Sequence, residues 1–269
     1  MIYNKFFVID SHCHIYPEKI ASKAVAGTDN FYKITVSAHG GTTAELMEIA
    51  RETGIDRFVV ESVATTPKQV KSINEFIAEE VEKSDGKFIG VGTLHPDSED
   101  IAGDIDHLLE LGLKGVKLHP DIQAFKIDDY RCLKIYEICE EKGIPILMHT
   151  GDNRYDFSNP NRLAPILEIY KNLTVIGAHF GGYSVWFEAA EKLKDFKNFY
   201  VDCSSSFFAL TDEEIMKLIR AYGTEKVLFG TDFPMWSPKS ELERFMNLPL
   251  SDEEKTVILS KNALKIYGE

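Results

Sequence analysis

Four histidines and one aspartate stand where apolar segments of the sequence end. His12 and His14, with one residue between them, stand at the end of the first segment, and His149, His179 and Asp232 end three later ones. Side chains alternate along a strand, so both imidazoles of the first pair share a face and can reach one cation. Three neutral imidazoles and a carboxylate suit Zn²⁺ or another borderline divalent ion, such as Mn²⁺ or Fe²⁺. We therefore predict one divalent metal ion, with Zn²⁺ first, whose ligands are His12, His14, His149 and Asp232.

A catalytic metal leaves one coordination position open to water or substrate. Water bound there has its pKa lowered towards about 7, so hydroxide becomes available at neutral pH. His179 is then the natural general base, because a neutral imidazole with a pKa of about 6.5 can accept a proton at working pH. The alternative is that His179 is a fifth ligand.

The elements that must position these residues follow a regular pattern. Short apolar, β-branched segments alternate with longer amphipathic ones, which is typical of repeated βα units. The predicted strands are 5–12, 57–63, 88–94, 115–119, 145–149, 174–179, 199–203 and 227–232. The predicted helices are 43–53, 67–84, 98–111, 129–142, 160–171, 183–194, 212–222, 239–247 and a closing C-terminal helix, 252–267.

Eight such repeats predict a single α/β domain over residues 1–269, a (β/α)8 TIM barrel with reacting groups at the C-terminal ends of its strands. An open doubly wound sheet would need a glycine-rich phosphate loop after its first strand, where this chain has Ser11-His-Cys-His14. The segment from Ile15 to Gly41 shows no clear pattern. We predict an extended loop there that covers the site.

Composition limits the partners of the chain. A formal net charge of −13 repels phosphate backbones, so nucleic acid is not expected. Apolar runs stay well short of the ~20 residues that span a bilayer, and the N-terminus lacks the features of a signal peptide, so we expect no membrane contact and a cytoplasmic location. A small-molecule substrate is the expected partner, and a homodimer is left open.

The four cysteines lack a CxxC pair and are expected to be reduced. Cys13 lies between the two paired histidines and should point to the opposite face of its strand.

The motifs together resemble the amidohydrolase superfamily, in its amidohydrolase-2 type. They are Asp10-Ser-His-Cys-His14, His149-Thr-Gly151, Ala178-His-Phe-Gly-Gly182 and Gly230-Thr-Asp-Phe-Pro234. The likeness spans almost the whole chain and points to the single-metal branch, which includes aminocarboxymuconate-semialdehyde decarboxylase and γ-resorcylate decarboxylase. It implies a distorted barrel whose metal is held by the HxH pair, the strand-five His and the strand-eight Asp, with the strand-six His as acid/base.

Other polar residues at strand ends have two interpretations each. Two-metal members of the superfamily carry a carboxylated lysine in the fourth strand, where Lys117 lies. A buried lysine that supports the site by hydrogen bonds is the simpler interpretation. His119 shares a strand face with Lys117, and we assign it as a substrate contact or a support to the ligands. Arg154 is the best-placed partner for a substrate carboxylate, although pairing with Asp152 or Asp156 is an equally good interpretation.

Two reactions fit this set of residues. In hydrolysis, the bound hydroxide attacks the carbonyl of an amide, lactone or ester; in non-oxidative decarboxylation, the metal orients an acid while His179 handles a proton. We expect a metal-dependent hydrolase, with a carboxy-lyase as the alternative. A TatD-type deoxyribonuclease is less favoured, because those enzymes carry a fourth-strand glutamate where this chain reads Val116-Lys-Leu-His119. A non-catalytic binding barrel is disfavoured by the presence of all five site residues.

Overall fold

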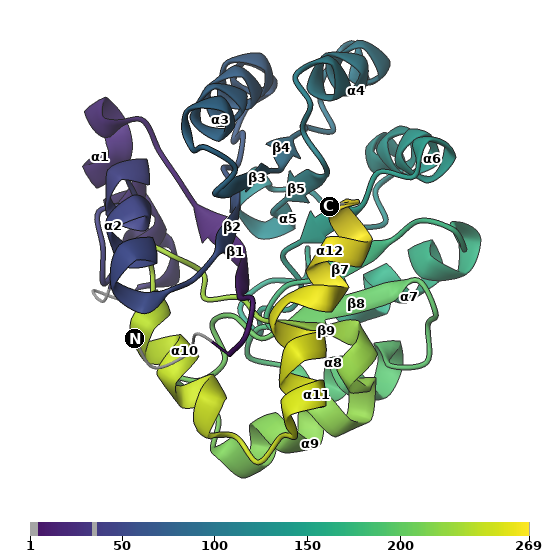
Figure 1. The fold of residues 1–269 in the computed structure, drawn as a ribbon. Helices are drawn as coiled ribbons and strands as arrows, with labels where there is room; N and C mark the ends of the chain where they lie inside the picture. The colour runs from purple at the N-terminus through teal and green to yellow at the C-terminus, as the bar shows by residue number, and fades with distance from the viewer. Residues whose placement is uncertain (1–4, 34–36, 269) are drawn as a thin grey trace.

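The protein folds as a ring of parallel strands surrounded by helices, in a computed structural model that describes residues 5–33 and 37–268 (Figure 1). The strands are β1 (Ile9–His14), β2 (Arg57–Glu61), β3 (Phe88–Gly90), β4 (Gly92–Thr93), β5 (Val116–Leu118), β6 (Ile146–Met148), β7 (Val175–Gly177), β8 (Phe199–Asp202) and β9 (Val227–Leu228). One sheet has the order β1-β2-β3 and the other runs from β4 to β9.

Backbone hydrogen bonds connect the two sheets at both of their junctions. The N–H of Val91, between β3 and β4, donates to the carbonyl of Val60 in β2 (2.9 Å). At the other junction, the N–H of Ser11 donates to Phe229 (2.8 Å) and that of Asp232 donates to His12 (2.9 Å). The predicted (β/α)8 barrel is confirmed, with β3 and β4 as two halves of its third strand.

Helices cover the outside of the ring. The longer ones are α1 (Glu18–Tyr32), α2 (Thr43–Thr53), α3 (Val70–Lys83), α4 (Ile101–Glu110), α6 (Leu133–Lys142), α7 (Pro160–Ile169), α8 (Trp186–Leu193), α9 (Asp212–Tyr222) and α10 (Pro238–Asn247). The shorter ones are α5 (Pro120–Gln123), α11 (Asp252–Thr256) and α12 (Asn262–Tyr267), with turns η1 (Pro67–Gln69), η2 (Tyr130–Cys132), η3 (Thr224–Lys226) and η4 (Val257–Lys261). The predicted closing helix is α11, a π-helical turn and α12 in succession. None of the described helices is long and apolar enough to cross a membrane.

Helix α1 is the main departure from the sequence prediction, because it occupies most of the segment predicted as a loop. Its amphipathic pattern is weak: Ala21 is its one fully buried residue, and residues 27–30 read Gly-Thr-Asp-Asn, all poor helix formers. Lys33, in the left-handed conformation (φ 57°), ends the helix. Packing on the barrel, rather than helix propensity, accounts for the C-terminal part of α1.

The two ends of the barrel differ. At one end, inward-facing strand residues form a buried cluster with Ala263 and Tyr267 of α12, and this helix closes that end of the barrel. The strand residues of the cluster include Ile9, Val59 and Leu228. A larger apolar core lies between the strands and the helices and includes Cys13, which thus faces away from the paired histidines as predicted. All four cysteines are buried and free. Because α12 fills one end, the polar residues at the strand C-termini gather at the other.

Candidate active site

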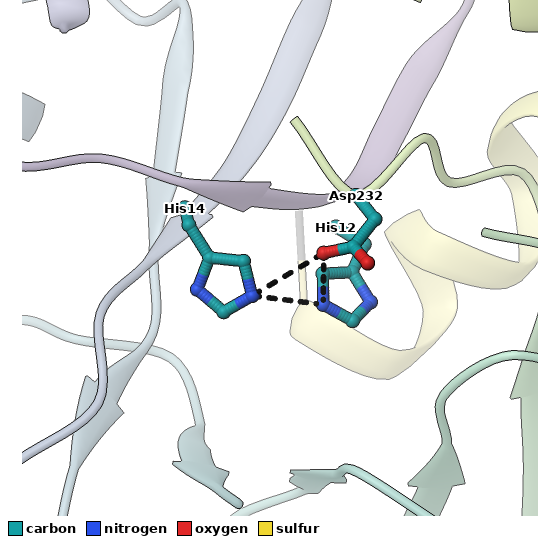
Figure 2. Close-up of side chains that lie close together, drawn as sticks. All are labelled: His12, His14 and Asp232. Atoms are coloured by element: carbon teal, nitrogen blue, oxygen red, sulfur yellow. Dashed lines mark hydrogen bonds and ion pairs between the residues drawn. The ribbon is translucent and has the colours of Figure 1, made fainter. Parts of the chain in front are cut away.

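Three predicted ligands converge where β1 ends. His12 and His14 come from β1 and Asp232 from the segment after β9 (Figure 2). Their facing atoms form a triangle: His12 Nε2 lies 3.3 Å from His14 Nε2 and 3.5 Å from Asp232 Oδ1, and His14 Nε2 lies 3.4 Å from that oxygen. Ligands held about 2.0–2.2 Å from one ion lie roughly 3.0–3.5 Å apart at tetrahedral or octahedral angles. The triangle therefore fits a single cation.

Hydrogen bonds hold this triangle in place. The Asp10 carboxylate accepts the N–H (2.9 Å) and hydroxyl (2.6 Å) of Thr231, which ties β1 to the residue before Asp232.

Two site residues have a left-handed backbone conformation, Asp232 (φ 62°) and His179 (φ 60°). Non-glycine residues in this region carry strain of about 1–3 kcal/mol each, and such strain clusters at functional sites.

The hydrogen bonds of His12 place its proton on Nδ1 and leave Nε2 as its acceptor nitrogen. Its Nδ1 lies 2.9 Å from Asp202 Oδ2, and a carboxylate only accepts, so Nδ1 carries the proton. Lys117 Nζ, a donor, lies 2.8 Å from Nε2, which is therefore an acceptor. Burial opposes the charge of Asp202, but His12 and the Ser204 hydroxyl hold its pKa well below the usual value. Asp202 thus holds the ring of His12 in one orientation and tautomer, as carboxylates hydrogen-bonded to metal-binding imidazoles do.

His149 and His179 form a second pair of facing nitrogens. His179 Nδ1 lies 3.1 Å from the carbonyl oxygen of Ser204, so Nδ1 carries the proton, and its Nε2 lies 3.1 Å from His149 Nδ1. His149 Nε2 points to Asp121 Oδ2 at 3.5 Å. Among the described residues, His149 groups with His119 and Asp121 rather than directly with the triangle of His12, His14 and Asp232. His179 lies between these two groups, because its Nε2 faces His149 and its ring stacks on that of His12 (centroids 5.2 Å apart).

Charges at the site favour metal binding. Burial lowers the pKa of His14 and of His179 to about 4, and that of His149 well below its usual value, so these rings are neutral at pH 7. Burial opposes the charge of Asp232, but His12, His14 and His179 hold its pKa well below the normal range. Neutral imidazoles and an ionised carboxylate are the forms that bind a cation.

Two buried acids, Glu61 and Asp202, were not predicted from the sequence. Glu61 ends β2 with both oxygens lacking a hydrogen-bond partner, and Oε1 lies 3.5 Å from Lys117 Nζ and 3.4 Å from His12 Nε2. Burial raises the pKa of Glu61 to about 7. This arrangement suits Lys117 as an ammonium, because a carbamate there would face a carboxylate. An acidic residue that ends an otherwise apolar strand was the available signal for both.

A cavity of about 730 Å³ opens beside these residues. His12, His14, His149, His179, Lys117 and Asp232 line it on one side. Its other walls come largely from α1 and α3, with Ile20, Phe31, Ile73 and Phe76 among the apolar side chains. Helix α1 therefore covers the site, as was predicted for the segment that contains it.

The two predicted substrate contacts are placed differently. His119 lines the cavity, with its ring stacked on that of His149 (4.0 Å, 6°) and its Nε2 2.8 Å from the Tyr32 hydroxyl. Arg154 does not appear among the described lining residues. Its Nε and Nη2 bind the Asp152 carboxylate (2.9 and 2.6 Å), and Nη1 donates to the carbonyl of Phe31 (2.8 Å). The structure thus favours the Asp152 pairing over the direct carboxylate contact predicted for Arg154.

Known proteins resemble this chain in sequence and fold. A 2-amino-3-carboxymuconate-6-semialdehyde decarboxylase from Dictyostelium discoideum is 26% identical over 241 residues, which cover 73% of this chain and 65% of that protein, so the chain spans just under two thirds of its length. An uncharacterised TIM-barrel protein from Bordetella bronchiseptica superposes with a TM-score of 0.81 at 21% identity, over 98% of this chain and all of that one.

A solved 5-carboxyvanillate decarboxylase from Novosphingobium aromaticivorans, complexed with manganese and 4-hydroxy-3-methoxy-5-nitrobenzoic acid, has a TM-score of 0.80 at 15% identity, over 98% of this chain and 97% of that one. At such identities these structures show the fold alone. The family model described as amidohydrolase matches residues 9–268. The resemblance carried by the motifs is thereby confirmed, and the chain belongs to the amidohydrolase family.

Proposed function

We propose that this protein is a metal-dependent, non-oxidative decarboxylase of a small carboxylic acid with an apolar body. The observation that carries the proposal is the triangle of His12, His14 and Asp232 in the lining of a cavity whose other walls are mainly apolar. The decarboxylase names of the Dictyostelium and Novosphingobium relatives support it. They favour the carboxy-lyase alternative over the hydrolase that we placed first from the sequence.

The donor set fits a divalent ion, since two imidazole nitrogens and one carboxylate oxygen face each other at the spacing of ligands to one cation. Held by His12, His14 and Asp232, with His149 as the predicted fourth donor, a divalent ion would act as a Lewis acid on a substrate oxygen. The manganese in the Novosphingobium relative makes Mn²⁺ a candidate beside the predicted Zn²⁺.

His179 transfers the proton in this reaction. Its Nδ1–H donates to the carbonyl of Ser204, so its lone pair is on Nε2, which faces Nδ1 of His149 (3.1 Å). Nε2 accepts the proton of the carboxyl group or of a neighbouring hydroxyl and delivers it to the carbon that bears the carboxylate. The bond between that carbon and the carboxylate breaks, its electron pair returns to the substrate, and CO₂ leaves.

The apolar walls suit this reaction. The charge of a carboxylate is unfavourable away from water, and as CO₂ leaves that charge passes to the larger body of the substrate, where it is spread over more atoms. Phe31 and Phe76 offer aromatic surfaces to a flat apolar body. Hydrolysis of an amide or lactone would gain no comparable benefit from these walls.

The test is a substrate panel with the Mn²⁺-loaded and Zn²⁺-loaded protein. Aromatic and enoic acids are assayed for CO₂ release, and lactones, esters and amides for hydrolysis. We expect CO₂ from at least one acid, abolished in His179→Asn and retained in the control His107→Asn, a histidine in α4 outside the described cavity lining. Turnover of a lactone, ester or amide without CO₂ release from any acid would restore the hydrolase as the better assignment.

A further inference from the structure

We propose that Tyr32, at the end of α1, binds the substrate by donating its hydroxyl hydrogen to an oxygen of the acid, and that Arg154 serves the site by holding Tyr32 in place. This inference rests on the proposed function, because it assigns the group that recognises the acid.

The first step is the tautomer of His119. Its Nδ1 caps α5 by accepting the N–H of Ile122 (3.2 Å), so in the neutral ring the proton is on Nε2. The ring also stacks in parallel on that of His149 (4.0 Å), which agrees with a neutral state. The Nε2–H of His119 therefore donates to the Tyr32 oxygen 2.8 Å away.

The second step is the direction left to the Tyr32 hydroxyl hydrogen. Because the phenol oxygen accepts from His119, its own hydrogen is available to another acceptor. The hydrogen bonds of the described residues include none in which Tyr32 donates to another side chain or to the backbone. Tyr32 lines the cavity together with His149 and His179, and its ring centroid lies 6.2 Å from that of His149. A ligand oxygen in the cavity is the acceptor that this hydroxyl lacks.

The third step is the shortage of other partners for an acid. Lys117 and Lys23 are the lysines among the described lining residues, and no arginine lines the cavity there. Lys117 faces Glu61 and His12, and Lys23 is on the exposed side of α1. Tyr32 therefore offers the acid a neutral donor beside His149 and His179.

Arg154 holds the end of α1 that carries Tyr32. Its guanidinium lies 5.1 Å from the ring centroid of Tyr32 and 5.2 Å from those of Phe31 and Tyr155, within range of cation–π contact. Nη1 holds the carbonyl of Phe31, and Asp152 holds the guanidinium. Arg154 thus anchors the end of α1 to the loop after β6, and it is a positioning residue.

The test measures the binding of benzoate to the Mn²⁺-loaded protein by calorimetry. Loss of one hydrogen bond to a charged group should weaken binding roughly 10- to 100-fold, so we expect this increase in Kd for Tyr32→Phe, with metal content and melting temperature unchanged. The matched control is Tyr155→Phe, the same change beside the same guanidinium but outside the described lining. It should bind within twofold of the wild type.

A double variant separates the two roles. If Arg154 acts through Tyr32, Arg154→Ala weakens benzoate binding, and the double variant binds no more weakly than Tyr32→Phe alone. Additive losses would mean that Arg154 binds the acid directly and would overturn its positioning role. Wild-type affinity in Tyr32→Phe, or no benzoate binding to the wild type, would overturn the role of Tyr32. Tyr32-dependent binding without CO₂ release from any acid would reject the proposed reaction alone.

Discussion

Replacement of Asp202 by asparagine tests whether a buried carboxylate sets the metal affinity through His12. In the wild type, Oδ2 accepts the Nδ1–H of His12 at 2.9 Å. Oδ1 accepts the N–H groups of His179 (3.1 Å) and Ser204 (3.0 Å). An asparagine that keeps the bonds to Oδ1 turns its NH₂ group towards His12. Nδ1 must then accept, and the proton moves to Nε2, the atom that faces His14 and Asp232.

The expected loss follows from that geometry. Loss of the hydrogen-bond partner of a metal-binding imidazole typically weakens metal affinity 10- to 100-fold, or by about 1.4–2.8 kcal/mol. Asp202 is fully buried and is held in place by several donors, so the amide cannot turn away without leaving two N–H groups unpaired. We therefore expect Asp202→Asn to lie at the upper end, with Mn²⁺ and Zn²⁺ bound about 100-fold more weakly.

Competition with a chelator measures the affinity, and the melting temperature of the metal-free protein checks the fold. The control is Asp128→Asn, an exposed carboxylate paired with Arg162 (2.8 Å), which should keep wild-type affinity. Unchanged metal affinity in a folded Asp202→Asn would refute the argument that Asp202 fixes the tautomer of His12.

Three further predictions concern ligands, buried charge and backbone. His149→Ala should lose metal and activity, whereas His179→Asn should keep metal and lose 100-fold or more in turnover; elemental analysis showing the reverse would exchange their roles. Burial raises the pKa of Glu241 from 4.5 to about 8, so the wild type loses stability as the pH rises through this range. Urea unfolding should therefore show Glu241→Gln to be more stable than the wild type by about 2–4 kcal/mol at pH 8 but not at pH 4. Gly151→Ala, whose Cβ would lie 2.6 Å from the backbone of a neighbouring loop at a φ of +76°, should lower the melting temperature, and Gly27→Ala, with open space around it, should not.

Strand patterns made the barrel predictable, and with it the meeting of residues far apart in sequence. His12 and Asp232 could be placed together because the first and last strands of a closed barrel are neighbours. Glu61 and Asp202 end strands in the same way, yet an acid at a strand end is usually solvated. Their burial depends on the neighbouring strands, which the local sequence does not report.

Helix α1 and Arg154 could not be predicted, for a shared reason. Residues 27–30 of α1 are poor helix formers, and contacts with the barrel hold this end of the helix. Arg154 makes one of these contacts with Phe31, 123 residues earlier in the chain. The choice between a substrate carboxylate and Asp152 as its partner therefore depended on where α1 lies.

The charges around His12 give an independent reason for a divalent ion. Glu61, Asp202 and Asp232 each lie within 3.5 Å of its ring nitrogens, and one ammonium, that of Lys117, lies beside them. All four groups are buried or nearly so, and the surrounding imidazoles are neutral. Even with Glu61 partly protonated at pH 7, because its pKa is about 7, the acids outnumber the ammonium, and this excess of negative charge is costly away from water unless a cation balances it. A divalent ion supplies that balance, whereas loss of the ammonium charge of Lys117 would increase the excess.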